Sequence, residues 1–246
     1  MLGIGKQKPG FQVAVHGKHP GFDDYFTLNM DSPLACALVN WVEKGTELKK
    51  NHDNTRIHAF RFWIRGVNRG ELVFGIIKDS SDSLGRAYPL VIMVTGFVKD
   101  WEKRWHYIFS TFDTVFRMFE DISASHYENF KEFEKRLEKV ISLGLAKVKD
   151  LEMKQQHKDR AFHAPPLLPE IMLAWFNKNM KKGAMTLSVA TLSDKFASYT
   201  PVRRNQGVFK NKANVPGAVF LGGLPDNPVL AMFSRPLKAG DFLNLF

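Results

Sequence analysis

The stretch FRFWIRGVNRGELVFGIIKDSSDSLGRAYPLVIMVTGF, residues 60–97, decides the fold. It contains three short apolar runs, residues 60–64, 72–77 and 88–94, which are rich in Phe, Val, Ile and Leu. This composition is typical of strands on a surface that is at least half buried. The segments between the runs are polar and contain glycine, so the chain can turn there. The pattern predicts a three-stranded antiparallel meander.

Residues 90–94 are apolar at almost every position, which is typical of a strand covered on both faces. Helices must then lie on both sides of the sheet. After residue 97 the apolar period changes to that of two amphipathic helices, at about 100–119 and 126–149, which we expect to form a helical hairpin over about 98–150. The regular aromatic stripe of the first helix is interpreted as core packing rather than as the lining of a cofactor pocket, and no cofactor is expected.

The rest of the chain supplies the outer elements. Strands are predicted at 11–16, 185–190, 218–221 and 229–234, a turn at 222–228, and helices at 33–49, 170–181 and 238–246. Because strands occur on both sides of the helical hairpin, the sequence predicts one domain over residues 1–246. The expected fold class is α/β, a three-layer α/β/α sandwich with a mixed, largely antiparallel central sheet.

Composition excludes several classes of protein. With 21 Phe and 5 Trp among 246 residues the chain can bury a large core, which excludes a disordered protein. No apolar run reaches the roughly 18 residues of a membrane span, and the first residues lack an apolar signal core, so we expect a cytoplasmic protein. The net charge of +10 favours acidic partners in general. The lysines are spread along the chain rather than gathered into one block, so nucleic acid is not the expected partner. The oligomeric state is not indicated.

The single cysteine, Cys36, excludes an internal disulfide and any cysteine-rich zinc site. It falls in an apolar helical pattern, so it is predicted to be a small core residue rather than a nucleophile.

His16, His19, Asp23 and Asp24 are close enough in sequence to suggest a metal site, because imidazole and carboxylate groups are common metal ligands. The alternative is that the aspartates bind turn amides. A metal-dependent hydrolase that uses this cluster is therefore the second functional hypothesis.

Two other patterns have weaker functional interpretations. Arg203, Arg204, Lys210 and Lys212 form a basic cluster, which suits nucleic acid or a solvated loop equally well. The serines of residues 80–83, beside Arg86, suit phosphate or a solvated turn. The motifs GxSxG, GxGxxG and the P-loop are all absent from the sequence.

Three blocks resemble the TagF/ImpM family of type VI secretion accessory proteins. They are GKHPGFDDYF at 17–26, FRF at 60–62 with GIIKDSSDSLGRAYPL at 75–90, and FLGG at 220–223. The middle block is the most specific. The family-motif residues are Gly17, Lys18, Pro20, Asp23, Asp24, Asp82, Gly85, Arg86, Pro89, Gly222 and Gly223.

The resemblance implies a three-layer α/β sandwich and a non-enzymatic role. TagF proteins are post-translational repressors of type VI secretion, in some systems through contact with a forkhead-associated scaffold protein. The expected partner is therefore a protein of the secretion apparatus or its phosphorylation pathway, with no small-molecule substrate. The motif residues also suggest a structural hypothesis: the loops at 17–24 and 78–87 converge, and Asp23 or Asp24 pairs with Arg86.

Overall fold

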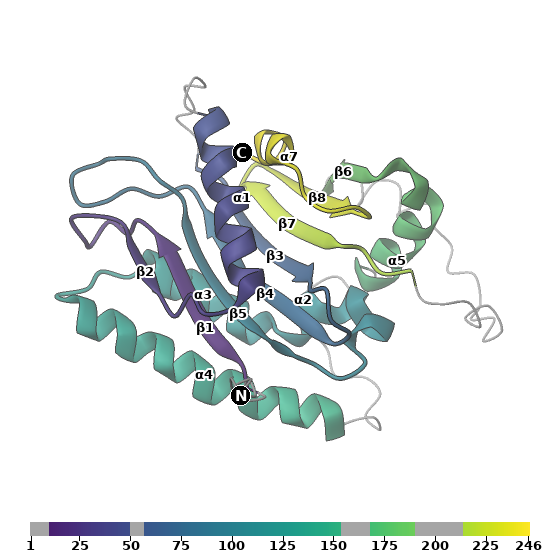
Figure 1. The fold of residues 1–246 in the computed structure, drawn as a ribbon, viewed down its shortest axis with the longest axis horizontal. Coiled ribbons are helices and arrows are strands. Elements are labelled where there is room, and N and C mark those ends of the chain that lie inside the picture. Colours follow the sequence, from purple (N-terminus) through teal and green to yellow (C-terminus); the bar gives the residue numbers. More distant parts are fainter. Residues whose placement is uncertain (1–9, 50–56, 154–167, 190–213) are drawn as a thin grey trace, which may run out of the picture.

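The computed structural model describes residues 10–49, 57–153, 168–189 and 214–246. Its centre is the predicted meander, in which β3 (Ala59–Arg65), β4 (Glu71–Lys78) and β5 (Leu90–Phe97) pair in the middle of an eight-stranded sheet (Figure 1). β5 begins two residues later than predicted, because Pro89 has no N–H to donate to a ladder. All of β5 except Phe97 is buried, which confirms that both of its faces are covered.

Two strands extend the sheet beyond β5 and three extend it beyond β3. β1 (Gln12–Gly17) pairs with β5, and the short β2 (Phe26–Leu28) forms that edge. On the other side the order is β7 (Ala218–Leu224), β8 (Asn227–Phe233) and β6 (Ala184–Ser188). Every pairing between described strands is antiparallel, whereas a mixed, largely antiparallel sheet was expected. The sheet is open, with β2 and β6 as its two edge strands.

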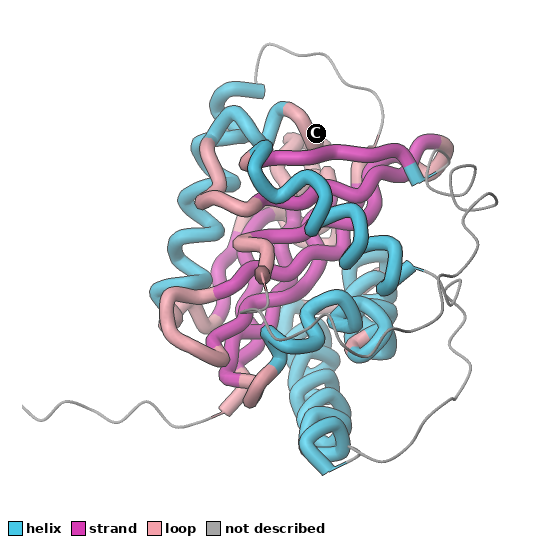
Figure 2. The backbone as a smooth tube through the Cα atoms, turned by 90° about the vertical axis from the view of Figure 1, so that its right-hand side faces the viewer, coloured by secondary structure: helices cyan, strands magenta, loops and turns pink. Residues whose placement is uncertain are grey.

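Helices cover both faces of the sheet, as Figure 2 shows from the side, which confirms the three-layer sandwich. One face carries α1 (Pro33–Lys49) and α7 (Ala239–Leu243). The other carries η1 (Trp101–Tyr107), α2 (Ile108–Thr111), α3 (Asp113–Ala124), α4 (Phe130–Met153) and α5 (Leu168–Asn179), which η2 (Met180–Lys182) follows. Alternate residues of β4 serve the two layers: Val73 packs under α1, whereas Phe74 packs under the larger group of helices.

The helix predicted at about 100–119 is divided into η1, α2 and α3. Asp100 adopts a left-handed conformation with φ 56°, Arg104 leaves the helical region with φ −133°, and Phe112 interrupts the helix with φ −101°. The Phe112 ring stacks on Phe74 with centroids 4.2 Å apart. Packing of this aromatic stripe on the sheet therefore overrides the helical periodicity of the sequence. The second helix, α4, follows residues 125–129 and contacts α3.

Two further predictions are corrected. Cys36 is exposed, not a core residue, and its thiol donates to the carbonyl oxygen of Met30 at 3.2 Å. Residues 222–224 belong to β7, because the strand ladder continues to the pair of Leu224 with Asn227 and leaves only residues 225–226 for the turn. The basic cluster of residues 203–212 lies outside the described residues. None of the helices in the described parts of the chain is long and apolar enough to cross a membrane.

Candidate functional site

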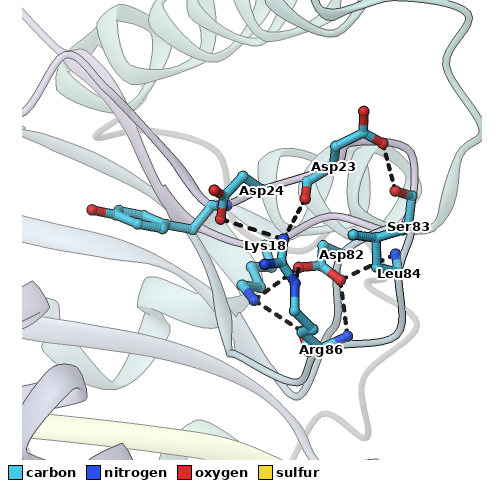
Figure 3. Close-up of polar contacts among 8 residues, drawn as sticks. Lys18, Asp23, Asp24, Asp82, Ser83, Leu84 and Arg86 are labelled. Carbon is cyan, nitrogen blue, oxygen red and sulfur yellow. Dashed lines mark hydrogen bonds and ion pairs between the residues drawn. The ribbon is translucent and has the colours of Figure 1, made fainter.

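Two loops converge at one end of the sheet, as the sequence predicted (Figure 3). One follows β1 at residues 18–25, and the other connects β4 to β5 at residues 79–89. The amide of Ser83 donates to the carbonyl oxygen of Phe22 at 2.9 Å, and its hydroxyl donates to the carboxylate of Asp23 at 2.6 Å. The Arg86 guanidinium donates to the backbone oxygen of Asp23 at 2.6 Å. We call residues 18–25 and 79–89 together the loop pair.

The carboxylate of Asp82 is the centre of the loop pair. Its Oδ1 accepts the amide hydrogens of Leu84 at 3.1 Å and Arg86 at 2.8 Å. Its Oδ2 accepts from Lys18 Nζ at 2.8 Å and from Arg86 Nε at 2.7 Å. The side chain of Asp82 has no exposed surface, and that of Lys18 is only 12% exposed. One buried carboxylate thus joins the first loop, through Lys18, to the second.

Hydrogen bonds from Lys18 and Arg86 keep this carboxylate ionised. Burial alone would raise the pKa of Asp82, but the hydrogen bonds from Lys18 and from the amide and guanidinium of Arg86 lower this pKa to about 2. A group with so low a pKa stays negative and holds no proton to donate at neutral pH. The carboxylate of Asp82 is therefore suited to a structural role as a buried anion.

The low pKa predicts a pH dependence of stability. Because the pKa of Asp82 in the folded chain, about 2, lies below its ordinary value of 3.8, the bonds to its anion contribute fully above about pH 4 and are lost as the pH falls through about 2. The difference in Tm between the wild type and Asp82→Asn should be constant from about pH 7 to pH 5 and shrink below about pH 4. Thermal unfolding of both proteins at a series of pH values measures this difference in Tm. A difference that does not change with pH would contradict the low pKa of Asp82.

Arg86 links the loops differently from the predicted aspartate pair. Its strongest carboxylate partner is Asp82, whereas Asp24 lies 3.7 Å away with a side chain 69% exposed, and Asp23 is contacted through its backbone. An exposed pair at that distance contributes little. The prediction that the two loops converge is therefore confirmed. The predicted pairing of Arg86 with the carboxylates of Asp23 and Asp24 is at most a secondary contact.

Replacement of Arg86 measures how much the bonds of its guanidinium between the two loops contribute to the stability of the chain. We expect Arg86→Ala to lower the free energy of unfolding by about 1–2 kcal/mol, because the Asp82 and Asp23 acceptors lose a charged donor while Lys18 remains on Asp82. Arg117→Ala is the matched control, because Arg117 is similarly exposed and forms a surface ion pair with Asp113; its effect should stay below about 0.5 kcal/mol. Urea unfolding compares them, and equal losses would show that Arg86 does not bridge the loops.

The backbone of the loop pair depends on particular family-motif residues. Gly17 has φ 126°, and a Cβ there would lie 1.9 Å from the carbonyl oxygen of Pro89, so the first loop leaves β1 directly against the start of β5. Gly85 has φ 78° and faces open space. Pro20 is exposed and follows the first residue of a turn closed by the amide of Phe22 and the carbonyl of His19 at 3.0 Å.

Gly222 and Gly223 are not part of the loop pair. They lie in β7 opposite Phe60 and Ala59, and β3 separates them from β4, at whose end the second loop begins. Gly222 has φ 143°, and a Cβ there would lie 2.2 Å from the carbonyl oxygen of Ala59. Gly222 therefore allows a close approach of β3 and β7, whereas a Cβ at Gly223 would meet no atom closer than 3.5 Å and this glycine instead allows a positive φ of 111°.

The suggested metal ligands do not gather. His16 Nδ1 is 2.8 Å from the Thr27 hydroxyl and its Nε2 is 3.2 Å from the Tyr88 hydroxyl. His19 is buried against the rings of Tyr127 and Phe133. Burial lowers the pKa of both histidines. Within the described ranges, no group of three or more His, Cys, Asp or Glu side chains could hold a metal ion.

The surface of the loop pair exposes apolar and charged groups side by side. Leu84 is 70% exposed and Tyr25 is 60% exposed, while half of the Arg86 side chain is open to solvent. The sequence did not reveal that Lys18 and Asp82 would meet across the two loops. The spacing of Asp82 from Leu84 and Gly85 is nevertheless typical of an Asx turn, a signal that could have marked this aspartate as the centre.

Comparison with known sequences and structures gives this site a family context. Residues 14–143 match the family model for the TagF N-terminal domain, described as type VI secretion system-associated. The chain belongs to the TagF N-terminal domain family. The matched residues include the whole loop pair and the central meander, which confirms the resemblance noted in the sequence, whereas Gly222 and Gly223 lie outside them.

A solved structure has the same fold as this TagF-family chain. The crystal structure of PA0076 from Pseudomonas aeruginosa PAO1 is similar with a TM-score of 0.51 and 14% sequence identity, over 94% of this chain and 92% of that one. At this identity the likeness concerns the fold alone. No curated protein sequence matches the chain significantly.

Proposed function

We propose that this chain is a non-enzymatic, post-translational repressor of type VI secretion that acts in the cytoplasm by protein–protein contact. Membership of the TagF family, whose domain is associated with type VI secretion, supports the general role. The proposed partner is a forkhead-associated scaffold protein of the secretion system, and the proposed contact surface is the loop pair. Residues 1–246 would serve this role as one domain.

The observation that supports the proposal most is that buried hydrogen bonds order the loop pair beneath side chains that are exposed to solvent. Asp82 is buried and accepts four hydrogen bonds, while Leu84, two residues later, is 70% exposed. A loop that is already ordered loses little conformational entropy when it binds, so more of its contact energy becomes affinity. Exposed aromatic and arginine side chains, here Tyr25 and Arg86, are typical centres of protein interfaces.

The ionisable groups of the loop pair support a binding role over a catalytic one. Lys18, Asp82 and Arg86 are bonded to one another, and the pKa of Asp82, about 2, makes it a poor general base near neutral pH. The charges therefore maintain loop shape.

Binding to a purified forkhead-associated scaffold protein tests the proposal. Leu84→Asp should weaken binding at least about tenfold, because it places a charge where an apolar contact is expected. Ile57→Asp is the matched control, since Ile57 is 63% exposed and lies outside the loop pair. Biolayer interferometry with the wild type and both variants measures the difference. Equal affinities for all three would exclude the loop pair as the contact surface, and no binding by the wild type would exclude this partner.

A further inference from the structure

A groove of about 760 Å³ lies at the opposite end of the meander from the loop pair. It opens where β3 ends and β7 begins, beside the first half of α1. A volume of this size is in the range of pockets that bind small molecules. The groove shares no residue with the loop pair, so its role is separate from the function proposed above.

The floor and walls of the groove are the open end of the apolar layer under α1. Leu38 and Trp41 of α1 line it and are buried, with 4% and 7% of their surfaces exposed. Leu34, Ile64 and Leu237 also line it but are only partly buried, because no other element among the described residues covers the layer there. The indole N–H of Trp41 already donates to the carbonyl oxygen of Lys238 at 2.8 Å. The walls thus favour an apolar ligand body.

The charges around the groove favour a negative headgroup. Three arginines but a single carboxylate, that of Glu102, line it. Glu102 is engaged by the amide of Gly70 at 2.6 Å, and Arg235 forms a two-point ion pair with Asp241. Arg69 is paired with Asp100 at 3.0 Å. In the part of the chain that the structure describes, the exposed guanidinium of Arg65 has neither a hydrogen bond nor an ion pair.

We propose that this groove binds an amphipathic anion, a carboxylate on an apolar chain or ring, with Arg65 pairing with the carboxylate and the α1 wall covering the apolar body. A guanidinium can donate two parallel hydrogen bonds to a carboxylate, which gives the headgroup a fixed orientation. Burial of the apolar body against Leu34, Ile64 and Leu237 closes the open end of the layer.

Displacement of 8-anilinonaphthalene-1-sulfonate, an apolar anion whose fluorescence rises in such sites, tests the groove in the full chain. Decanoate should displace the dye, whereas decanol and decyltrimethylammonium, which have the same chain without the negative charge, should displace it at least about tenfold more weakly. Arg65→Glu should weaken decanoate binding by a similar factor. Ala37→Trp should abolish it, because Ala37 lines the groove and the larger ring would fill it.

Lys131→Glu is the matched control for the change of charge, since Lys131 is exposed on α4, on the other face of the sheet. This variant should bind decanoate like the wild type. Thermal unfolding of each variant checks that it is folded. No displacement by decanoate, or equal binding by the wild type and a folded Arg65→Glu chain, would overturn the proposal.

Discussion

Asp82→Asn is expected to lower the Tm of the chain by about 5 to 10 °C, because it removes the charge at the centre of a buried network. The carboxylate accepts four hydrogen bonds, two at each oxygen. An asparagine amide has one oxygen, and its NH₂ group would face two of the four donors. Lys18, with a side chain only 12% exposed, would lose its charged partner. Differential scanning calorimetry at neutral pH measures the change.

Asp24→Asn is the control for the loss of a carboxylate from the loop pair. The side chain of Asp24 is 69% exposed and lies 3.7 Å from Arg86, so its removal should change the Tm by no more than about 1 °C. If the two variants have the same Tm, then Asp82 does not hold the loops together.

Gly17→Ala is expected to cost about 4 kcal/mol of unfolding free energy, or to prevent folding altogether. Two effects act together at this position. The φ of 126° is unfavourable for any residue with a Cβ, and that Cβ would lie 1.9 Å from the backbone oxygen of Pro89. Neither backbone can move away easily, because β1 and β5 are paired from Gln12 to His16. Chemical denaturation measures the free energy of unfolding of the variant. A loss of soluble protein on expression would indicate that the variant does not fold.

Gly85→Ala separates the effect of conformation from that of the clash. Gly85 also has a positive φ, of 78°, but an added Cβ would meet nothing within 4 Å. Its cost should be limited to about 1 kcal/mol for the left-handed conformation. Gly10→Ala, where nothing lies within 4 Å and φ is ordinary, should be neutral. If Gly17→Ala and Gly85→Ala lower the free energy of unfolding equally, then the contact with Pro89 is not the reason that position 17 requires glycine.

The meander and α1 could be predicted from the sequence because their signals are local. Alternation and β-branched or aromatic composition mark β3 and β4, and the proline at residue 33 marks the start of α1, whose predicted and observed bounds are the same. The interruption at Phe112 could not be predicted. It depends on the ring of Phe74, on a strand more than thirty residues earlier, and the aromatic stripe in the sequence continues through it.

The candidate site was predicted in outline but not in its centre. The glycines, proline and aspartates indicated two turns after strands, and the family motif indicated that Arg86 matters. The pair of Lys18 with Asp82 joins residues 64 positions apart, so no local pattern reveals it. The exposure of Cys36 has a similar cause, because helical periodicity alone does not show which side of α1 faces the sheet.

Secretion from cells that produce each variant tests most directly the central proposal, that this TagF-family chain represses type VI secretion and does so through the loop pair. Release of effector proteins into the medium is measured in cells that produce the wild type, Leu84→Asp or Ile57→Asp, with Tm confirming that each purified variant is folded. We predict that the wild type and Ile57→Asp reduce effector release and that Leu84→Asp does not. Equal repression by Leu84→Asp and the wild type would contradict the account.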